Sequence, residues 1–250
     1  MTDLLAVIGG SGLYKLDDDF KIERAEKLDT PFGKTSAELL FGHWHGQPVA
    51  FLPRHGTSHQ IPPHKINYRA NLWALKSIGV SHVIAANAVG GISQNYPPEA
   101  LGVPDQIIDY TSNREHTFFD GQNGEVRHVD FTQPYNKDLR AQINKAAISQ
   151  GIDLVDGGTY GCTNGPRFES AAEIQKMKAD GCDMIGMTGM PEAALARELE
   201  LDYASIALVV NWCAGIDDAD ISMAQINSIL DTGVDRIRRL IHATLVEKTL

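Results

Sequence analysis

Residues 4–12 read Leu-Leu-Ala-Val-Ile-Gly-Gly-Ser-Gly, an apolar run that ends in a glycine-rich turn. Apolar runs that are bounded by Gly, Pro or Asn are typical of buried strands. Glycines after a strand let the backbone curl and aim its N–H groups at an anion. The turn is not a complete GxGxxG fingerprint, because Lys15 stands where the third glycine belongs, and it is not a P-loop. It is therefore either an anion site or only a tight connection.

The same alternation of short apolar runs and longer amphipathic ones continues along the chain. Strands are predicted at 4–8, 48–53, 82–87, 105–110, 157–162, 183–187 and 203–211. Helices are predicted at 64–78, 135–150, 170–180, 190–200 and 222–246. This alternation indicates an α/β fold with a mostly parallel mixed sheet covered by helices on both faces. One domain over residues 1–250 is expected, since single α/β domains often reach this length.

Composition and charge exclude several classes of protein. The formal net charge of −10 argues against a general nucleic-acid binder, which usually carries a basic face. No apolar run approaches the roughly 20 residues of a membrane span. No basic region precedes the first apolar run, so a signal peptide is not expected and the protein should be cytoplasmic. The 3 cysteines lack CxxC spacing and are expected to be buried reduced thiols.

Polar residues follow the predicted strand 48–53. Arg54 and His55 come where that strand ends, at the carboxyl edge that binds ligands in open α/β sheets. An arginine guanidinium can hold phosphate through two N–H bonds. The same sequence pattern would also occur for a surface arginine beside an ordinary histidine. The 9 histidines include no HExxH or similar ligand set, so no metal site is expected. The longest irregular stretch, 111–134, is expected to be functional.

Four ordered segments carry a resemblance to a known family. Residues 162–173 read CTNGPRFESAAE and 185–192 read IGMTGMPE, after the earlier Gly-Gly-Ser-Gly of 9–12 and Pro-Arg-His-Gly of 53–56. The set resembles the trimeric purine nucleoside phosphorylase and methylthioadenosine phosphorylase family over almost the whole chain. The resemblance implies a phosphorylase/hydrolase-like fold, a homotrimer, and substrates that are a purine nucleoside and inorganic phosphate. It implies no metal, no organic cofactor, and no nucleic-acid or membrane partner.

The resemblance also implies roles for residues on the phosphate and sugar sides. The phosphate side would consist of Ser11, Arg54, His55, the backbone N–H of Ala88, and Thr188. Arg54 is expected to be replaceable with little change in the fold. The sugar side would consist of Met187 on the ribose, His59 near the ribose or its 5′ group, Met223 and Ile226 in the 5′ slot, and His128 reaching from a neighbouring subunit.

The 5′ slot decides the first question of specificity. Members that act on inosine place a polar residue there, often His, and no His occurs between residues 212 and 241. Met223 and Ile226 are apolar and suit a thioether, which packs well against methionine. A 5′-methylthio group is therefore expected rather than a hydroxyl. The same two residues, and Met187, would also fit a hydrophobic core.

The base is the second question, and it rests on Glu169 and Asn211. Family members that cleave methylthioadenosine have an Asp at the Asn211 position and another at the position of Cys213, and adenine-preferring members have Ser where Glu169 stands. An ionised Glu only accepts hydrogen bonds, so Glu169 suits the N1–H of a 6-oxopurine. Asn211 serves either purine at N7. Phe168 either stacks on the base or belongs to the core. The alternative role for Glu169 is a negative charge near the N-terminus of the following helix, where it would interact with the helix dipole.

The expected reaction is phosphorolysis of 5′-methylthioinosine to hypoxanthine and 5-methylthioribose 1-phosphate, with Asn211 and Glu169 as the catalytic pair on the base. The alternatives within the family are cleavage of methylthioadenosine or of inosine and guanosine. Outside it, a nucleoside hydrolase would use water in place of phosphate, and a nucleotide-binding module would show no turnover. An NAD-linked dehydrogenase is disfavoured by the incomplete glycine fingerprint.

Overall fold

The computed structural model describes residues 4–121 and 124–248, so the predicted domain of 1–250 extends beyond both described ends. Its centre is an 11-stranded mixed sheet whose main path runs β10-β8-β13-β7-β1-β6-β5-β2. The strands are β1 Leu4–Gly9, β2 Phe20–Glu26, β5 Leu39–Trp44, β6 Gln47–Pro53, β7 Val80–Gly91, β8 Leu101–Val103, β9 Gln106–Asp109, β10 Val155–Asp156, β11 Thr159–Cys162, β12 Met184–Gly186 and β13 Asp202–Trp212. A separate short pair is formed by β3 Asp29–Thr30 and β4 Gly33–Lys34.

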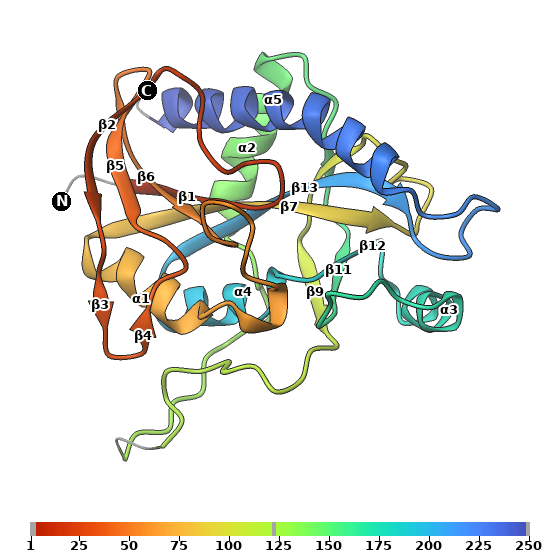
Figure 1. Cartoon of the computed structure of the whole chain (residues 1–250), viewed down its shortest axis with the longest axis horizontal. Coiled ribbons are helices and arrows are strands. Elements are labelled where there is room, and N and C mark those ends of the chain that lie inside the picture. The colour runs from red at the N-terminus through yellow and green to blue at the C-terminus, as the bar shows by residue number, and fades with distance from the viewer. Residues whose placement is uncertain (1–3, 122–123, 249–250) are drawn as a thin grey trace.

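Helices cover both faces of this sheet (Figure 1). One face carries α2 and α5, and the opposite face carries α1 and α4. The helices are α1 Tyr68–Ser77, α2 Lys137–Ser149, α3 Ala171–Ala179, α4 Gly189–Glu198 and α5 Met223–Lys248. The predicted α/β fold with a mostly parallel mixed sheet is confirmed, since β1, β6, β7 and β13 pair in parallel while β5 and β2 join antiparallel.

The alternation of side chains along β1 divides the core into two. Leu5 and Val7 belong to the cluster that packs under α2 and α5. Ala6 and Ile8 belong to the cluster that includes residues of α1 and α4. Successive side chains of a strand point to opposite faces, so a strand that is covered on both sides must be apolar throughout. This is why the first apolar run of the sequence forms a central strand.

Every strand and helix predicted from the sequence is present, with ends that differ by a few residues. The predicted helix 64–78 begins later, at Tyr68, after a short 3-10 turn at Pro63–Lys65. The structure adds strands that the pattern did not predict, chiefly β2 and β5, which form one margin of the sheet. In the predicted irregular stretch, the described residues 111–121 and 124–134 contain no helix or strand, and residues 122 and 123 lie outside the described residues.

Two smaller expectations concern membranes and cysteines. Among the described helices, none is long and apolar enough to cross a membrane. Cys162, Cys182 and Cys213 are all buried and unpaired, as expected.

Candidate active site

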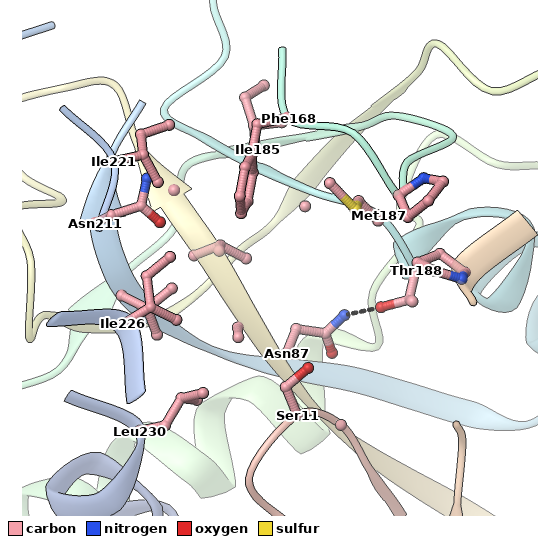
Figure 2. Close-up of a pocket in the computed structure, with 18 of the residues that line it drawn as sticks. Ser11, Asn87, Phe168, Ile185, Met187, Thr188, Asn211, Ile221, Ile226 and Leu230 are labelled. Atoms are coloured by element: carbon pink, nitrogen blue, oxygen red, sulfur yellow. Dashed lines mark hydrogen bonds between the residues drawn. The ribbon is translucent and has the colours of Figure 1, made fainter. Parts of the chain in front are cut away.

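A cavity of about 350 Å³ opens where β1, β6, β7 and β13 come to their carboxyl ends. Figure 2 shows Ser11, Asn87 and Thr188 on one side of this cavity, and Asn211, Ile221 and Phe168 on the other. Parallel strands bring their carboxyl ends to one edge, which is the usual ligand side of such sheets. The start of α5 and the loop before α3 complete the walls.

The structure brings the residues predicted for the site together in this one cavity, with a single exception. The cavity is lined by Ser11, Arg54, His55, His59, Ala88, Phe168, Glu169, Met187, Thr188, Asn211, Met223 and Ile226. The exception is His128, which is exposed on the loop between β9 and α2. Segments from the whole length of the chain therefore meet at one place, as a multi-part reaction centre requires.

Arg54 is not a free surface arginine. Its side chain is 0% exposed, and Nε and Nη2 donate to the two oxygens of Glu192 at 2.8 and 2.7 Å. Burial alone lowers the pKa of Arg54, but the facing carboxylate outweighs burial and the pKa lies above its ordinary value. The burial of Arg54 and its two bonds to Glu192 argue against the expectation that Arg54 can be replaced with little change in the fold. Tyr203 also donates to this carboxylate, at 2.8 Å.

One hydrogen of the Arg54 guanidinium has no hydrogen-bond partner among the described residues. Nη1 donates to the Ala86 carbonyl at 3.0 Å, and Nη2 also reaches Asn87 Oδ1 at 3.4 Å. A guanidinium has five N–H donors, so one Nη1 hydrogen is left. A side chain on Gly10 would overlap the Ala86 carbonyl and approach this Nη1 at 3.1 Å. Glycine is therefore required at this point of the turn, and the turn backbone lies against the guanidinium.

Asn87 connects the arginine pair to Thr188. Its Nδ2 donates to Thr188 Oγ1 at 3.0 Å, a bond visible in Figure 2. Its Oδ1 accepts from Arg54 and from Ser205. An amide nitrogen only donates, so the Thr188 oxygen is the acceptor and its own hydrogen is free to donate. Since Thr188 lines the cavity, this hydroxyl is an oriented donor to whatever occupies that end.

Two histidine rings lie against each other, tilted by 32°, beside the same end of the cavity. His55 and His59 have ring centroids 4.5 Å apart, and His59 adopts a left-handed φ of 56°. Burial, together with the charge of Arg54, lowers the pKa of His55 to about 4, and burial also lowers the pKa of His59. The Tyr14 hydroxyl lies 3.2 Å from His59 Nδ1. Both shifts favour the neutral form of the imidazole.

At the opposite end, a β-bulge determines how Asn211 is presented. The pairing of β13 with β7 shifts between Val209 and Asn211. In a regular strand neighbouring side chains face opposite ways, and bulges commonly re-aim side chains beside active sites. Here Val210 and Asn211 both line the cavity. Asn211 Nδ2 donates to the Trp212 carbonyl at 2.6 Å, which fixes the amide and leaves Oδ1 and one N–H for a ligand.

Glu169 and Phe168 lie on the loop that precedes α3. Thr163 Oγ1 donates to Glu169 Oε1 at 2.6 Å, so the carboxylate is held through one oxygen and the other stays available. Phe168 is 43% exposed although it lines the cavity, which contradicts the alternative that it belongs to the core. A half-exposed ring beside a fixed carboxylate is suited to stacking on a planar, hydrogen-bonding ligand.

The remaining wall is apolar and comes from α5 and the residues just before it. Ile221, Met223, Ile226 and Leu230 line it, and Figure 2 shows Ile226 and Leu230 on this side. Met223 is 56% exposed, whereas Ile226 is 6% exposed. The residues on this wall offer a ligand apolar contact rather than a hydrogen-bonding side chain, apart from Asn227.

The sequence matches the Phosphorylase superfamily over residues 4–246. The chain belongs to this superfamily. It is 50% identical, over 238 residues and 95% of each chain, to a probable S-methyl-5′-thioinosine phosphorylase of Xanthomonas campestris. It is 43% identical to a 6-oxopurine nucleoside phosphorylase of Pyrococcus furiosus, over 96% of this chain and 91% of that one. Methylthioadenosine phosphorylase from Schistosoma mansoni in complex with adenine superposes with a TM-score of 0.92 at 31% identity, covering 98% of this chain and 91% of that chain.

Sequence reasoning missed two residues that line this phosphorylase cavity, Tyr14 and Asn87, and one that is buried behind Arg54, Glu192. Glu192 ends the 185–192 segment but gave no sign of its partner, which lies 138 residues earlier. Asn87 ends the predicted strand 82–87 and Tyr14 follows the glycine-rich turn, but neither position indicates which groups these side chains contact. A polar residue near a glycine turn or a strand end indicates a ligand site. It does not identify the residue that will form a hydrogen bond with it.

A possible metal-ligand set lies elsewhere in the described chain. Asp17, Asp19 and His45 have ligand-capable atoms within 4.8 Å of one another. The two ring nitrogens of His45 face the two carboxylates at 3.5 and 3.6 Å. None of these three residues lines the phosphorylase cavity.

Proposed function

We propose that this phosphorylase cleaves S-methyl-5′-thioinosine with inorganic phosphate, giving hypoxanthine and 5-methylthioribose 1-phosphate. One observation carries the proposal: a fixed carboxylate, Glu169, and a fixed amide, Asn211, line the same cavity as the oriented hydroxyl of Thr188. The first two residues suit a 6-oxopurine, and the third suits phosphate. The relatives named as thioinosine and 6-oxopurine phosphorylases support the same assignment.

The base would lie between Phe168, Glu169 and Asn211. Glu169 accepts from N1–H of the 6-oxopurine through its free oxygen. Asn211 accepts from a protonated N7 through Oδ1 and donates to O6 through its remaining N–H. An adenine would place its N1 lone pair against the carboxylate, which is an unpaired acceptor in a closed site. Recognition of this kind discriminates against the wrong base much more strongly than apolar contact does.

Phosphate would bind at the opposite end of the cavity. The donors there are the Thr188 hydroxyl, the Ser11 hydroxyl, the last Nη1 hydrogen of Arg54 and backbone N–H groups that include that of Ala88. Arg54 is the only Arg or Lys among the described residues that line this cavity, and Glu192 balances its charge. The site would therefore hold phosphate through many oriented donors rather than through a free cation.

The reaction then depends on positioning and charge placement. The C1′–N9 bond breaks as the sugar gains oxocarbenium character, and the N9 electron pair passes into the purine. A phosphate oxygen bonds to C1′, so the pentosyl group is transferred from nitrogen to oxygen. Asn211 stabilises the purine as N7 takes a proton, and Met187 packs on the ribose. Residues that fix both reactants supply these effects, so no metal or organic cofactor is invoked.

The 5′-methylthio group would lie against Met223 and Ile226 on the apolar wall, near His59. The chain would act as a homotrimer in the cytoplasm. The unpaired cysteines suit a reducing compartment. The described parts of the loop, residues 111–121 and 124–134, reach outward in Figure 1, and exposed Val126 and His128 are available to a neighbouring site.

The deciding experiment compares methylthioinosine, methylthioadenosine and inosine in one assay of base release, with and without phosphate. The proposal expects phosphate-dependent cleavage, with methylthioinosine the best substrate. Release of base without phosphate would identify a hydrolase. Preference for methylthioadenosine or inosine would move the assignment to one of those phosphorylases. Sedimentation of the same preparation tests the trimer.

A further inference from the structure

An arginine outside the cavity is bonded to two segments that contribute to its wall. Arg114 is half-buried in the loop between β9 and α2, and it is not one of the residues that line the cavity. Its Nη2 donates to the carbonyls of Thr163, Asn164 and Met187 at 3.2, 3.1 and 2.9 Å. Its Nη1 donates to the carbonyl of Met190. A guanidinium suits this arrangement, because it spreads five N–H donors over one rigid plane.

The four carbonyls belong to the segments that follow β11 and β12. The two strands pair in parallel as far as Cys162 and Gly186, and Thr163 N adds one bond to the Gly186 carbonyl at 2.9 Å. Beyond this point the first segment leads to α3 and the second leads to α4. Arg114 therefore links the two segments just past the end of their strand pairing.

Each of these segments carries side chains of the cavity. The first carries Glu169, whose carboxylate accepts from Thr163 Oγ1 at 2.6 Å. The second carries Met187 and Thr188. The segments also touch, since a side chain on Gly165 would overlap Met187 Sδ. The placement of the Glu169 carboxylate relative to the Thr188 hydroxyl therefore depends on how the two segments are held together.

A tyrosine extends the connection to a third part of the wall. The Tyr68 hydroxyl accepts from Arg114 Nη1 at 3.3 Å and donates to the Pro63 carbonyl at 3.0 Å. The guanidinium also lies over the Tyr68 ring, 5.3 Å from its centroid. Since Pro63 lines the cavity, the bonds of Arg114 reach three separate stretches of the cavity wall.

Other residues attach the loop that carries Arg114 to the body of the protein. Thr117 Oγ1 and Phe118 N donate to the buried carboxylate of Glu198 at 2.6 and 2.7 Å. Arg69 Nη1 donates to the Thr117 carbonyl at 3.4 Å. The loop is therefore anchored by contacts that do not involve Arg114, whereas the bonds of Arg114 go to the segments of the cavity wall.

We propose that Arg114 is a positioning residue that fixes the base end of the cavity relative to the phosphate end. This inference rests on the proposed function for the identity of the two reactants. A displacement of about 1 Å between reacting groups can lower a rate roughly 100-fold, even when its cause is remote from the chemistry. Each reactant keeps its own contacts when Arg114 is replaced. Loss of alignment should therefore lower turnover far more than it weakens the binding of either reactant alone.

The test compares wild type with Arg114→Lys, by kcat and by calorimetric binding of phosphate alone and of the released base alone. Lysine keeps the charge, but its three hydrogens share one nitrogen and cannot span both segments as a guanidinium does. We expect kcat to fall roughly 100-fold and each dissociation constant to change by less than about threefold. Arg69→Lys is the matched control and should keep kcat, because Arg69 anchors the same loop through partners outside the cavity wall. Wild-type kcat in Arg114→Lys, or binding that weakens in step with kcat, would overturn the proposal.

A second variant tests the same link where Arg114→Lys does not fold. Thr163→Val removes the hydroxyl that holds Glu169 and keeps the carbonyl that Arg114 binds. It should lower kcat more than the affinity for the base. Its effect should combine with that of Arg114→Lys to less than the product of the two. Unchanged kcat in Thr163→Val, or fully multiplicative effects, would contradict the positioning role.

The positioning role and the proposed function fail separately. If wild type prefers another nucleoside and Arg114→Lys lowers kcat with that one, the proposed function is rejected and the role of Arg114 stands. If methylthioinosine is the preferred substrate and Arg114→Lys cleaves it at the wild-type rate, the role of Arg114 is rejected and the proposed function stands.

Discussion

The carboxylate of Glu192 accepts two hydrogen bonds from the guanidinium of Arg54, and neither side chain has any exposed surface. The pair joins the residue that follows β6 to α4, and it fixes the position of the one guanidinium hydrogen that remains for a ligand. Arginine in the Pro-Arg-His-Gly segment therefore has two functions. It is part of the folded core, and it lines the cavity at the end where we propose that phosphate binds.

Breaking this pair should destabilise the protein strongly. Arg54→Ala leaves the buried Glu192 charge without its cationic partner and with only the Tyr203 hydroxyl as a donor, and removal of one member of a buried ion pair typically costs about 3–5 kcal/mol. Urea unfolding of Arg54→Ala, Glu192→Ala and the double variant measures the coupling. The double variant should be more stable than the sum of the single losses predicts. Asp235→Ala removes an exposed partner of Arg238 and should cost no more than about 1 kcal/mol. Wild-type stability in Arg54→Ala would contradict the structural role.

Thr188 should contribute to phosphate binding through its hydroxyl alone. Thr188→Val keeps the shape and removes the donor, and a hydrogen bond to a charged group contributes about 1.5–3 kcal/mol. The Michaelis constant for phosphate should rise roughly 10- to 100-fold, while that for the nucleoside changes little. Thr188→Ser restores the hydroxyl and should recover most of the affinity. An unchanged phosphate constant in Thr188→Val would remove this residue from the phosphate site.

His55 should make the protein less stable in mild acid. Its folded pKa of about 4 lies below the ordinary 6.5, so the unfolded chain binds a proton in a pH range where the folded chain does not. Stability therefore rises with pH between these values and falls as the pH drops from about 6.5 toward 4. The loss at pH 4.5 should be on the order of 2–3 kcal/mol. His55→Gln has no titrating ring, so its unfolding free energy should fall less between pH 7 and pH 4.5. The same fall in both proteins would show that the ring is not kept neutral.

The sequence predicted the strands of the sheet centre because those strands are covered on both faces and are therefore continuously apolar. It did not predict β2, whose residues after Phe20 are mostly exposed, because an edge strand with one open face has no such run. The antiparallel pairing of β2 with β5 is a tertiary contact that stabilises polar sequence as strand. Local pattern contains no information on that pairing.

The local sequence pattern also fails to predict the tertiary contacts of the site. The position of Arg54 at a strand end was readable, but its partner Glu192 was not, since burial of an ion pair depends on how α4 packs. The bulge that lets Val210 and Asn211 share the cavity also has no local signal, because Val209 and Val210 read as ordinary strand. Residue identities at the site followed from ordered motifs. Whether each of these residues acts as a hydrogen-bond donor or as an acceptor could be assigned only from the three-dimensional structure.

The apolar wall should favour a methylthio group over a hydroxyl. Methylthioinosine should exceed inosine in kcat/KM by about 10- to 200-fold, the range for one small apolar contact in a pocket. Ile226→Thr places a hydroxyl on this wall and should reduce the ratio. Ile229→Thr changes the same helix at a residue that is 6% exposed and does not line the cavity, so it should lower stability without altering the ratio. Inosine used as well as methylthioinosine by wild type would exclude a thioether slot.

Glu169 and Asn211 should together make methylthioinosine a far better substrate than methylthioadenosine, by up to roughly 10⁴-fold in kcat/KM. Glu169→Gln supplies a donor toward N1, so it should penalise the 6-oxopurine and narrow the preference. Glu173→Gln is the matched control, since Glu173 is bonded to Arg167 and Ser170 and does not line the cavity. That control should leave the preference unchanged.

Asn211→Asp tests the other half of the pair, and the structure sharpens the expectation. Asn211 Nδ2 donates to the Trp212 carbonyl at 2.6 Å, and a carboxylate there would set two oxygens against each other. The variant carboxylate must turn away or take up a proton, and in either case the donor to O6 is lost. Turnover of methylthioinosine should fall, and methylthioadenosine should gain little, because Cys213 does not supply a second carboxylate. The measurement is kcat/KM for both nucleosides on wild type and each variant. A wild type that prefers methylthioadenosine, or an Asn211→Asp enzyme that retains full activity on methylthioinosine, would show that the base is recognised in another way.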